Sequence, residues 1–314
     1  MPSLTVVVPA YNESAGLREF QRRLAAVFDT LALECRVLYV DDGSRDDTFA
    51  VMESLRAADA RVATLRLSRN FGKELAVTAG LDHCDADAVV VIDADLQDPP
   101  ELIAQFVALW REGYDVVYGT RASRAGETAV KKLTSAAFYR VMERLTDKPI
   151  PRDTGDFRLM SRRVVDALKR LRERQRFMKG LFAWVGYRQA SVVYERDPRH
   201  AGQTKWNYWK LWNFALEGIT SFSSAPLKLA TYLGFAAAAL AFVFGLWVFA
   251  KALLYGDPVR GYPSLMVVVL FLGGAQLMAL GVIGEYLGRT YVEAKQRPLY
   301  LVDRYEPSRD STPG

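Results

Sequence analysis

Residues 88–101 read AVVVIDADLQDPPE, a β-branched apolar run that ends in two aspartates and continues into two prolines and a glutamate. The apolar run predicts a short buried strand over Ala88–Ile92. A helix is predicted to begin at Pro99–Glu101, because proline suits the first helical turn and glutamate suits the positive end of the helix dipole. Strand, polar loop and helix in this order form the repeating unit of an α/β fold with a parallel sheet.

The same unit recurs on both sides of this stretch. Similar apolar runs predict further strands at Leu4–Val8, Arg36–Val40, Val62–Leu67 and Asp115–Tyr118. Apolar residues recur at helical spacing after the first strand, at Leu17, Phe20, Leu24, Val27, Phe28 and Leu31. We therefore expect one α/β domain whose parallel sheet is covered by helices.

Polar loops follow four of these strands directly. They are residues 9–13 (PAYNE), 41–44 (DDGS), 69–73 (RNFGK) and 93–98 (DADLQD). Each loop taken alone could be an ordinary turn or helix cap, because Asp, Asn, Gly and Ser are common there. Ligands of open α/β sheets bind outside the carboxyl ends of the strands. Four polar loops at that edge therefore favour a binding site.

Asp93 and Asp95 stand two residues apart at a strand end, where their negative charges repel. A divalent cation would relieve this repulsion, and Mg²⁺ or Mn²⁺ readily combines carboxylate oxygens with substrate phosphates. Lys73 and Arg69 add positive charge for the same phosphates. The loops thus predict a metal-dependent site for a diphosphate leaving group.

The composition is that of a folded protein with a membrane anchor. The chain has 314 residues, half of them hydrophobic, and two cysteines, which excludes disordered, collagen-like and disulfide-stapled classes. Residues 229–250 and 262–284 carry no charge, and each is long enough to cross a bilayer core of about 30 Å as a helix. Buried core helices are the alternative, but such helices normally keep a polar face. We expect a transmembrane hairpin.

The charge pattern favours a cytoplasmic position for both ends of the chain. The first ten residues resemble a strand and not a signal peptide. Basic residues after the second apolar segment outnumber those in the hairpin loop, with Arg289, Lys295, Arg297, Arg304 and Arg309 against Lys251 and Arg260. No nucleic-acid-binding motif accompanies the net charge of +5, so anionic lipid or phosphate is the expected partner and nucleic acid is not.

These loops, together with residues 151–168 (PRDTGDFRLMSRRVVDAL), resemble the inverting glycosyltransferases of family 2, which have the nucleotide-sugar-binding GT-A fold. The chain resembles in particular the polyprenyl-phosphate (bactoprenol) glucosyltransferases and, more distantly, the dolichyl-phosphate mannosyltransferases. The resemblance continues through residues 176–189 and 201–223 into the hairpin, so it covers nearly the whole chain.

The resemblance implies a domain order. A GT-A (Rossmann-like, mostly parallel) catalytic domain at 1–204 would precede an amphipathic juxtamembrane helix at 205–225. Two transmembrane helices within 226–288 and a cytoplasmic tail at 289–314 would follow, in the bacterial inner membrane. Apolar residues at helical spacing support an interfacial helix, namely Trp206, Trp209, Trp212, Leu216, Ile219 and Phe222. A helix packed on the catalytic domain remains the alternative.

The resemblance also implies how the donor is held. The residues that would contact the nucleoside are Pro9, Tyr11, Glu13 and Asp42. Asp93 and Asp95 would contact the sugar and the diphosphate, Asp95 most directly through the metal, and Gln97 would complete the metal site. Asp156 occupies the position of the catalytic base of many family 2 enzymes.

A lipid phosphate acceptor changes what the site needs. Its second pKa is about 6, so it is largely dianionic at neutral pH and needs no proton removed. Asp156 is therefore expected to position the sugar or a basic partner, or else to act as a true base. Cations that hold the phosphate in line are needed instead. Candidates are Arg121, Arg124, Lys131, Arg199 and Lys205, for which an ordinary surface position is the alternative.

The expected activity is inverting transfer of a hexose, glucose from UDP-glucose in particular, to undecaprenyl phosphate, with Mg²⁺ or Mn²⁺ as cofactor. One alternative is a processive polysaccharide synthase, although its Gln-x-x-Arg-Trp motif is absent and two helices cannot enclose a glycan pore. Another is a non-catalytic nucleotide-sugar sensor, which would be expected to lose the metal carboxylates. Small residues in the apolar segments, including Gly234, Gly273 and Gly274, favour helix association and a homo-oligomer.

Overall fold

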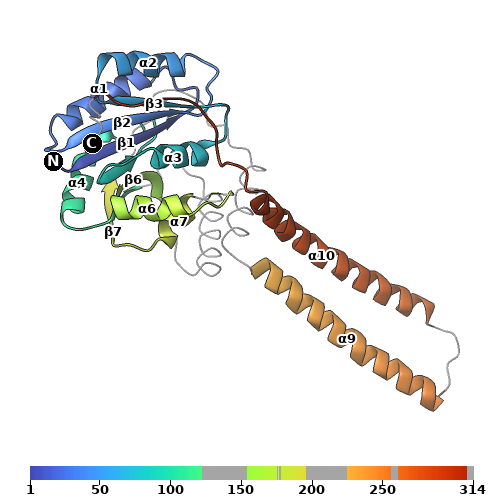
Figure 1. Cartoon of the computed structure of the whole chain (residues 1–314). Helices are drawn as coiled ribbons and strands as arrows, with labels where there is room; N and C mark the ends of the chain where they lie inside the picture. Colours follow the sequence, from blue (N-terminus) through green and yellow to red (C-terminus); the bar gives the residue numbers. More distant parts are fainter. Residues whose placement is uncertain (122–153, 175, 177, 196–224, 256–260, 310–314) are drawn as a thin grey trace. The chain divides into compact units, whose positions relative to one another are not determined.

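The computed structural model describes residues 1–121, 154–174, 176, 178–195, 225–255 and 261–309 (Figure 1). The chain divides into two compact units. The first comprises Met1–Asn213 and Arg297–Gly314, and the second comprises Phe214–Gln296.

The first unit is built on an eight-stranded sheet with the order β7-β5-β6-β4-β1-β2-β3-β8. Its strands are β1 (Ser3–Ala10), β2 (Glu34–Asp41), β3 (Val62–Leu67), β4 (Ala88–Val91), β5 (Val116–Arg121), β6 (Thr154–Ser161), β7 (Gln189–Tyr194) and β8 (Val302–Glu306). The four central strands β4, β1, β2 and β3 are parallel, whereas β6 pairs antiparallel with both β4 and β5, and β8 pairs antiparallel with β3. The predicted α/β fold with a mostly parallel GT-A sheet is confirmed.

Helices cover both faces of this sheet. They are α1 (Leu17–Phe28), α2 (Thr48–Ala58), α3 (Lys73–Asp82), α4 (Ile103–Arg111), α6 (Arg162–Arg170) and α7 (Met178–Trp184), with a 3₁₀ turn η1 at Pro100–Leu102. Figure 1 shows α1 and α2 on one side of the central strands and α3 and α6 on the other. Because the central strands are mostly buried on both faces, their sequences are largely apolar and do not alternate regularly.

The main core lies between the sheet and α1, α2 and α4. Leu4, Val6 and Val8 of β1 point into it together with Phe20 of α1 and Phe106 of α4. The residues predicted for the inner face of the first helix are buried, except that Leu31 is only partly buried. The helical spacing therefore identified this packing face correctly.

One strand of the sheet comes from the predicted C-terminal tail. β8 adds to the edge at β3, and Tyr305 stands opposite Leu65. The segment is also tied down by the Tyr300 hydroxyl, which donates to Asp82 at 2.8 Å, and by the Arg309 N–H, which donates to Ala60 O at 2.9 Å. The end of the chain thus belongs structurally to the N-terminal unit.

The second unit contains two long helices, α9 (Ala225–Tyr255) and α10 (Tyr262–Ala294), which pack against each other. Within them, Ala230–Trp247 and Phe271–Ala294 are long and apolar enough to cross a membrane. Only 6% of the first segment and none of the second is buried, whereas the core helix of a soluble protein is mostly buried. The segments predicted to span, 229–250 and 262–284, are thus helical throughout. The predicted juxtamembrane helix at 205–225 lies outside the described residues, except for Ala225, which begins α9.

Candidate active site

The loops after β2 and β3 are joined through Asp42. Both of its carboxylate oxygens accept backbone N–H groups, from Phe71 at 2.7 Å and from Gly72 at 2.9 Å. Burial raises the pKa of Asp42, and these two N–H groups offset part of that effect. The neighbouring Gly43 has φ +65°, and a Cβ there would lie 2.4 Å from the carbonyl carbon of Arg69. Glycine is therefore required where the two loops meet.

The loop after β1 is fastened to the same assembly. Asn12, with φ 56°, donates its N–H to Ser44 Oγ at 3.0 Å and accepts the N–H of Arg45 at 2.9 Å. The Glu13 N–H donates to Thr48 Oγ1 at 2.9 Å. Three consecutive strand ends thus form one interlocked rim, as the sequence predicted.

The predicted nucleoside residues lie along this rim at different depths. Pro9 is buried within β1, Glu13 is half-buried, and Tyr11 is exposed at the loop. Asp42 is buried and, as described above, accepts N–H groups from the chain that leads into α3. The exposed Arg69 packs its guanidinium over the Phe71 ring, 3.9 Å from the centroid.

Lys73 lies at the centre of the site. It is the first residue of α3, and its Nζ is 2.6 Å from an oxygen of Asp93 and 2.6 Å from an oxygen of Asp156. Three residues that the sequence assigned to one site thus meet here, although they come from α3, the end of β4 and β6. Burial would lower the pKa of Lys73, but the two carboxylates outweigh it and raise that pKa above its usual range.

The Asp93 carboxylate is partly buried against Lys73. Burial raises the pKa of Asp93, and the Lys73 ammonium offsets this rise only in part. Lys73 thus faces two carboxylates, and the charged Arg158 interacts with one of them, Asp156, on β6. The carboxylate oxygens can still accept hydrogen bonds from donors such as sugar hydroxyls.

The loop that follows carries the predicted metal ligands. The N–H of Gln97 donates to an oxygen of Asp95 at 3.1 Å. Leu96 between them is buried and has φ 59°, a left-handed conformation that is uncommon for a large side chain. At the end of the loop, the buried Asp98 accepts a hydrogen bond from the hydroxyl of Tyr194.

The donor set of this loop fits Mg²⁺ or Mn²⁺. A carboxylate and a side-chain amide supply hard oxygen ligands, which both ions prefer. Among the residues that the structure describes, no cluster of three or more His, Cys, Asp or Glu could hold a metal by itself. An ion bound by Asp95 and Gln97 would therefore need further oxygens from phosphate and water, as Mg²⁺ commonly does.

Arg158 is a buried cation that the sequence reasoning missed. It lies two residues after Asp156 on β6, so both side chains leave the same face of the strand. Its guanidinium donates to Gly155 O at 2.9 Å and lies 3.7 Å from the centroid of the Phe182 ring. Burial lowers the pKa of Arg158 to about 10, so it remains charged at neutral pH. The signal was the Asp-x-Arg spacing within one strand.

The predicted acceptor cations fall where the described structure ends. Arg121 is the last residue of β5. The other four, Arg124, Lys131, Arg199 and Lys205, lie outside the described residues.

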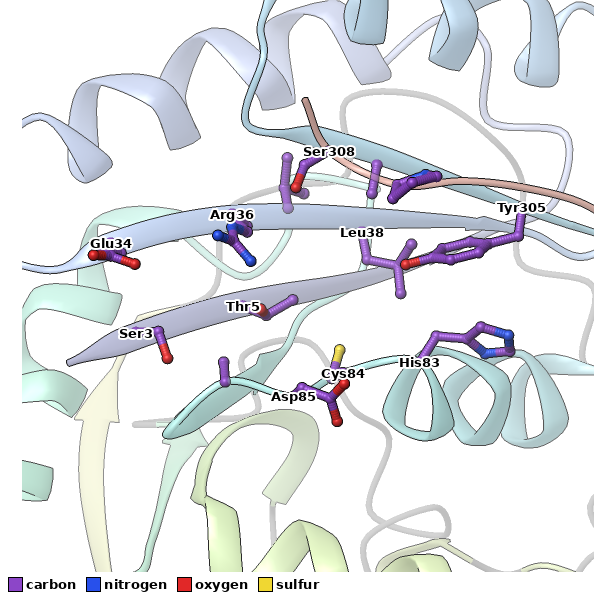
Figure 2. Close-up of a pocket in the computed structure, with 14 residues that line it drawn as sticks. Ser3, Thr5, Glu34, Arg36, Leu38, His83, Cys84, Asp85, Tyr305 and Ser308 are labelled. Carbon is purple, nitrogen blue, oxygen red and sulfur yellow. The ribbon is translucent and has the colours of Figure 1, made fainter. Parts of the chain in front are cut away.

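A cavity of about 200 Å³ lies at the amino ends of the central strands, opposite the rim (Figure 2). It is lined by residues at the amino ends of β1 and β2, such as Ser3 and Glu34, and by His83 and Tyr305, whose rings lie 5.0 Å apart. The residues predicted for the site do not line it. Because open α/β sheets bind ligands at the carboxyl ends of their strands, the rim remains the candidate site.

Two protein families match the chain in succession. Residues 5–169 match the family described as glycosyl transferase family 2. Residues 225–290, which include most of α9 and α10, match the GtrB C-terminal hairpin.

Individual proteins are similar over almost the full length. An uncharacterized glycosyltransferase from Synechocystis sp. is 55% identical, with 95% of this chain and 94% of that protein covered. A prophage bactoprenol glucosyl transferase homolog from Escherichia coli is 44% identical (96% and 98% covered), and the bactoprenol glucosyl transferase of Shigella phage SfV is 45% identical (95% and 97% covered). Among solved structures, a glucosyl-3-phosphoglycerate synthase from Mycobacterium tuberculosis is 22% identical over 69% of this chain and 77% of its own, with a TM-score of 0.46.

Proposed function

Because this chain belongs to glycosyl transferase family 2, we propose that it transfers glucose from UDP-glucose to the phosphate of undecaprenyl phosphate. The bactoprenol glucosyl transferases among its relatives match it from the catalytic domain through the hairpin. That near full-length match carries the assignment of both the sugar and the lipid acceptor. The protein is an enzyme of the transferase class.

The proposed reaction is a single displacement. A phosphate oxygen of the lipid attacks the anomeric carbon of glucose from the face opposite UDP. The new carbon–oxygen bond forms as the bond from the anomeric carbon to the diphosphate breaks. The electron pair of the broken bond leaves with UDP. The anomeric configuration is therefore inverted. No proton needs to be removed, because the lipid phosphate, with a second pKa of about 6, is already largely dianionic.

We assign the donor to the interlocked rim. Pro9, Tyr11, Glu13 and Asp42 would hold the nucleoside, and Arg69 would face the diphosphate. Because loops fixed to one another need little reordering on binding, their hydrogen bonds support a preorganised donor site. Asp95 and Gln97 would hold Mg²⁺ or Mn²⁺, which, when bound, neutralises charge on the departing diphosphate.

Lys73, Asp93 and Asp156 form the proposed sugar-facing part of the site. The Lys73 ammonium lies 2.6 Å from each of the two carboxylates. Both carboxylates can also accept hydrogen bonds from glucose hydroxyls. Since the acceptor needs no base, we propose that Asp156 positions the sugar. The acceptor phosphate is assigned to Arg121, Arg124, Lys131, Arg199 and Lys205.

We further propose that α9 and α10 cross the membrane as a hairpin and return the chain to the side it left. β8 follows the hairpin in sequence yet pairs with β3, which precedes it. If the chain crosses the membrane twice, it returns to the side of the catalytic domain, where β8 can pair with β3. The basic residues after the second span favour the cytoplasmic side of the bacterial plasma membrane, and the small residues within the spans favour a homo-oligomer.

The decisive experiment offers labelled UDP- and GDP-sugars to the purified full chain in detergent, with undecaprenyl phosphate and Mn²⁺ or Mg²⁺. Glucose label from UDP-glucose should appear in organic-extractable lipid and should need both acceptor and metal. Label in polymer would favour a polysaccharide synthase. Nucleotide binding without transfer from any donor would favour a sensor.

A further inference from the structure

The loop Asp93–Asp98, which carries the proposed metal ligands, is fixed at both ends. Asp93 pairs with Lys73 at the start. At the other end, Asp98 is 2% exposed and accepts a hydrogen bond from Tyr194, the last residue of β7. Between the two fixed ends, Leu96 adopts its left-handed conformation and separates Asp95 from Gln97.

Tyr194 reaches this loop from a distant strand. β7 is the edge of the sheet, and both β5 and β6 lie between it and β4. The Tyr194 ring passes over Gly119 of β5, where an added Cβ would lie only 2.7 Å from the ring atom Cε1. It then meets the Phe157 ring of β6 edge to face, with the centroids 6.3 Å apart. A glycine and an aromatic residue thus shape the path of this side chain.

The hydroxyl group has a specific partner at the end of that path. A hydrogen bond to a buried carboxylate is charge-assisted, and its loss would leave the Asp98 carboxylate short of a donor in a desolvated place. A large residue at positive φ persists only where its surroundings fix it. The two anchors of the loop, at Lys73 and Tyr194, constrain Leu96 together with the burial of its own side chain in the core.

We propose that Tyr194 is a positioning residue for the metal–diphosphate site. Its hydroxyl acts through Asp98 to fix the loop that presents Asp95 and Gln97 to the ion. The inference rests on the proposed function and adds to it a residue from the far edge of the sheet.

The test is Tyr194→Phe in the full chain, measured by Mn²⁺ binding in the presence of UDP. Free Mn²⁺ is counted by electron paramagnetic resonance. If the loop spends less time in its competent conformation, the apparent affinity falls by the same fraction, and loss of a hydrogen bond to a charged group predicts an increase of about tenfold in the Mn²⁺ dissociation constant. In the transfer assay, the Mn²⁺ concentration for half-maximal rate should rise similarly, while kcat at saturating Mn²⁺ stays within about threefold.

Tyr39→Phe is the matched control. Tyr39 is fully buried in the same domain, and its hydroxyl donates to Gln21 Oε1 at 2.7 Å. Its loss should lower the unfolding temperature without changing Mn²⁺ binding. A second variant, Tyr194→Phe with Asp98→Asn, should recover part of the Mn²⁺ affinity, because a neutral amide tolerates a missing donor better than a buried carboxylate does.

The proposal is overturned if Tyr194→Phe binds Mn²⁺ with UDP as tightly as the unsubstituted chain, or if Tyr39→Phe weakens binding to the same extent. These results would leave the transferase assignment intact when the unsubstituted chain is active. An unsubstituted chain that neither binds Mn²⁺ with UDP nor transfers glucose would overturn the proposed metal-dependent function and this inference with it.

Discussion

At the scale of single residues, Lys73 determines the charge balance of the site. Its ammonium lies 2.6 Å from both Asp93 and Asp156 and is the charge that joins the two carboxylates. Lys73→Met should therefore reduce kcat by roughly 100-fold or more, the loss typical of removing one preorganised electrostatic group. Lys73→Arg should keep a larger share of the activity, because it preserves the charge.

The control for this prediction is Lys169→Met. Lys169 donates to the backbone oxygen of Cys84 at 2.8 Å, away from the rim. Its loss should leave the transfer rate within about twofold, as for most substitutions outside functional features. Equal effects of the two substitutions would show that Lys73 acts only through folding.

Asp95 carries the proposed metal chemistry. Asp95→Asn should abolish metal-dependent transfer, because a neutral amide binds a divalent cation much more weakly than a carboxylate does. The unfolding temperature should stay close to that of the unsubstituted chain, because the two side chains have nearly the same shape. Steady-state rates over a range of Mn²⁺ concentrations measure the effect. Asp85→Asn, at a side chain 89% exposed, serves as the control. Full activity of Asp95→Asn would remove the metal assignment.

At the scale of elements, β8 is a strand that the sequence did not predict. The segment VDRYE is short, polar and largely exposed, so it carries no strong strand pattern. Its partner β3 lies far away in sequence. In contrast, the central strands were predictable because buried parallel strands are continuously apolar and their polar loops follow at once.

The candidate site was predictable to a similar degree. The rim loops, Lys73 and Asp156 could be assigned from their motifs, whereas the pairing of Lys73 with two carboxylates depends on three-dimensional distances. The spacing of Asp156 and Arg158 within one strand was a usable signal for Arg158, whereas Tyr194 reaches Asp98 from another strand, for which a single sequence holds no pattern. All five acceptor cations, Arg121 included, remain predictions.

A proline in β8 tests its role in the sheet. Tyr305→Pro removes one N–H from the strand that pairs with β3 and should destabilise that pairing. Hydrogen exchange of the β3 amides should accelerate, whereas exchange in β4 should not change. Tyr305→Phe, which keeps the backbone N–H, is the control. Unchanged exchange in β3 would mean that β8 does not protect this edge.

At the scale of the whole molecule, the account predicts that the C-terminal segment and the hairpin loop face opposite sides of the membrane. The two native cysteines, Cys35 and Cys84, are buried and should react little with a thiol label. Burial raises the pKa of Cys35 to about 11 and that of Cys84 to about 12, so both stay protonated and unreactive at neutral pH.

Single cysteines introduced as Asp257→Cys in the loop between the spans and as Asp303→Cys in β8 then report topology. A membrane-impermeant maleimide added to intact spheroplasts should label Asp257→Cys and spare Asp303→Cys until the membrane is permeabilised. Labelling of both sites from the outside would contradict the hairpin.

The central claim, direct displacement onto a lipid phosphate, is tested most directly by nuclear magnetic resonance of the extracted product. The measurement uses UDP-α-glucose, undecaprenyl phosphate and the purified full chain with Mn²⁺. The expected product is a β-linked glucose whose anomeric proton couples to a single phosphorus. An α-linked product, or an anomeric proton without phosphorus coupling, would contradict it.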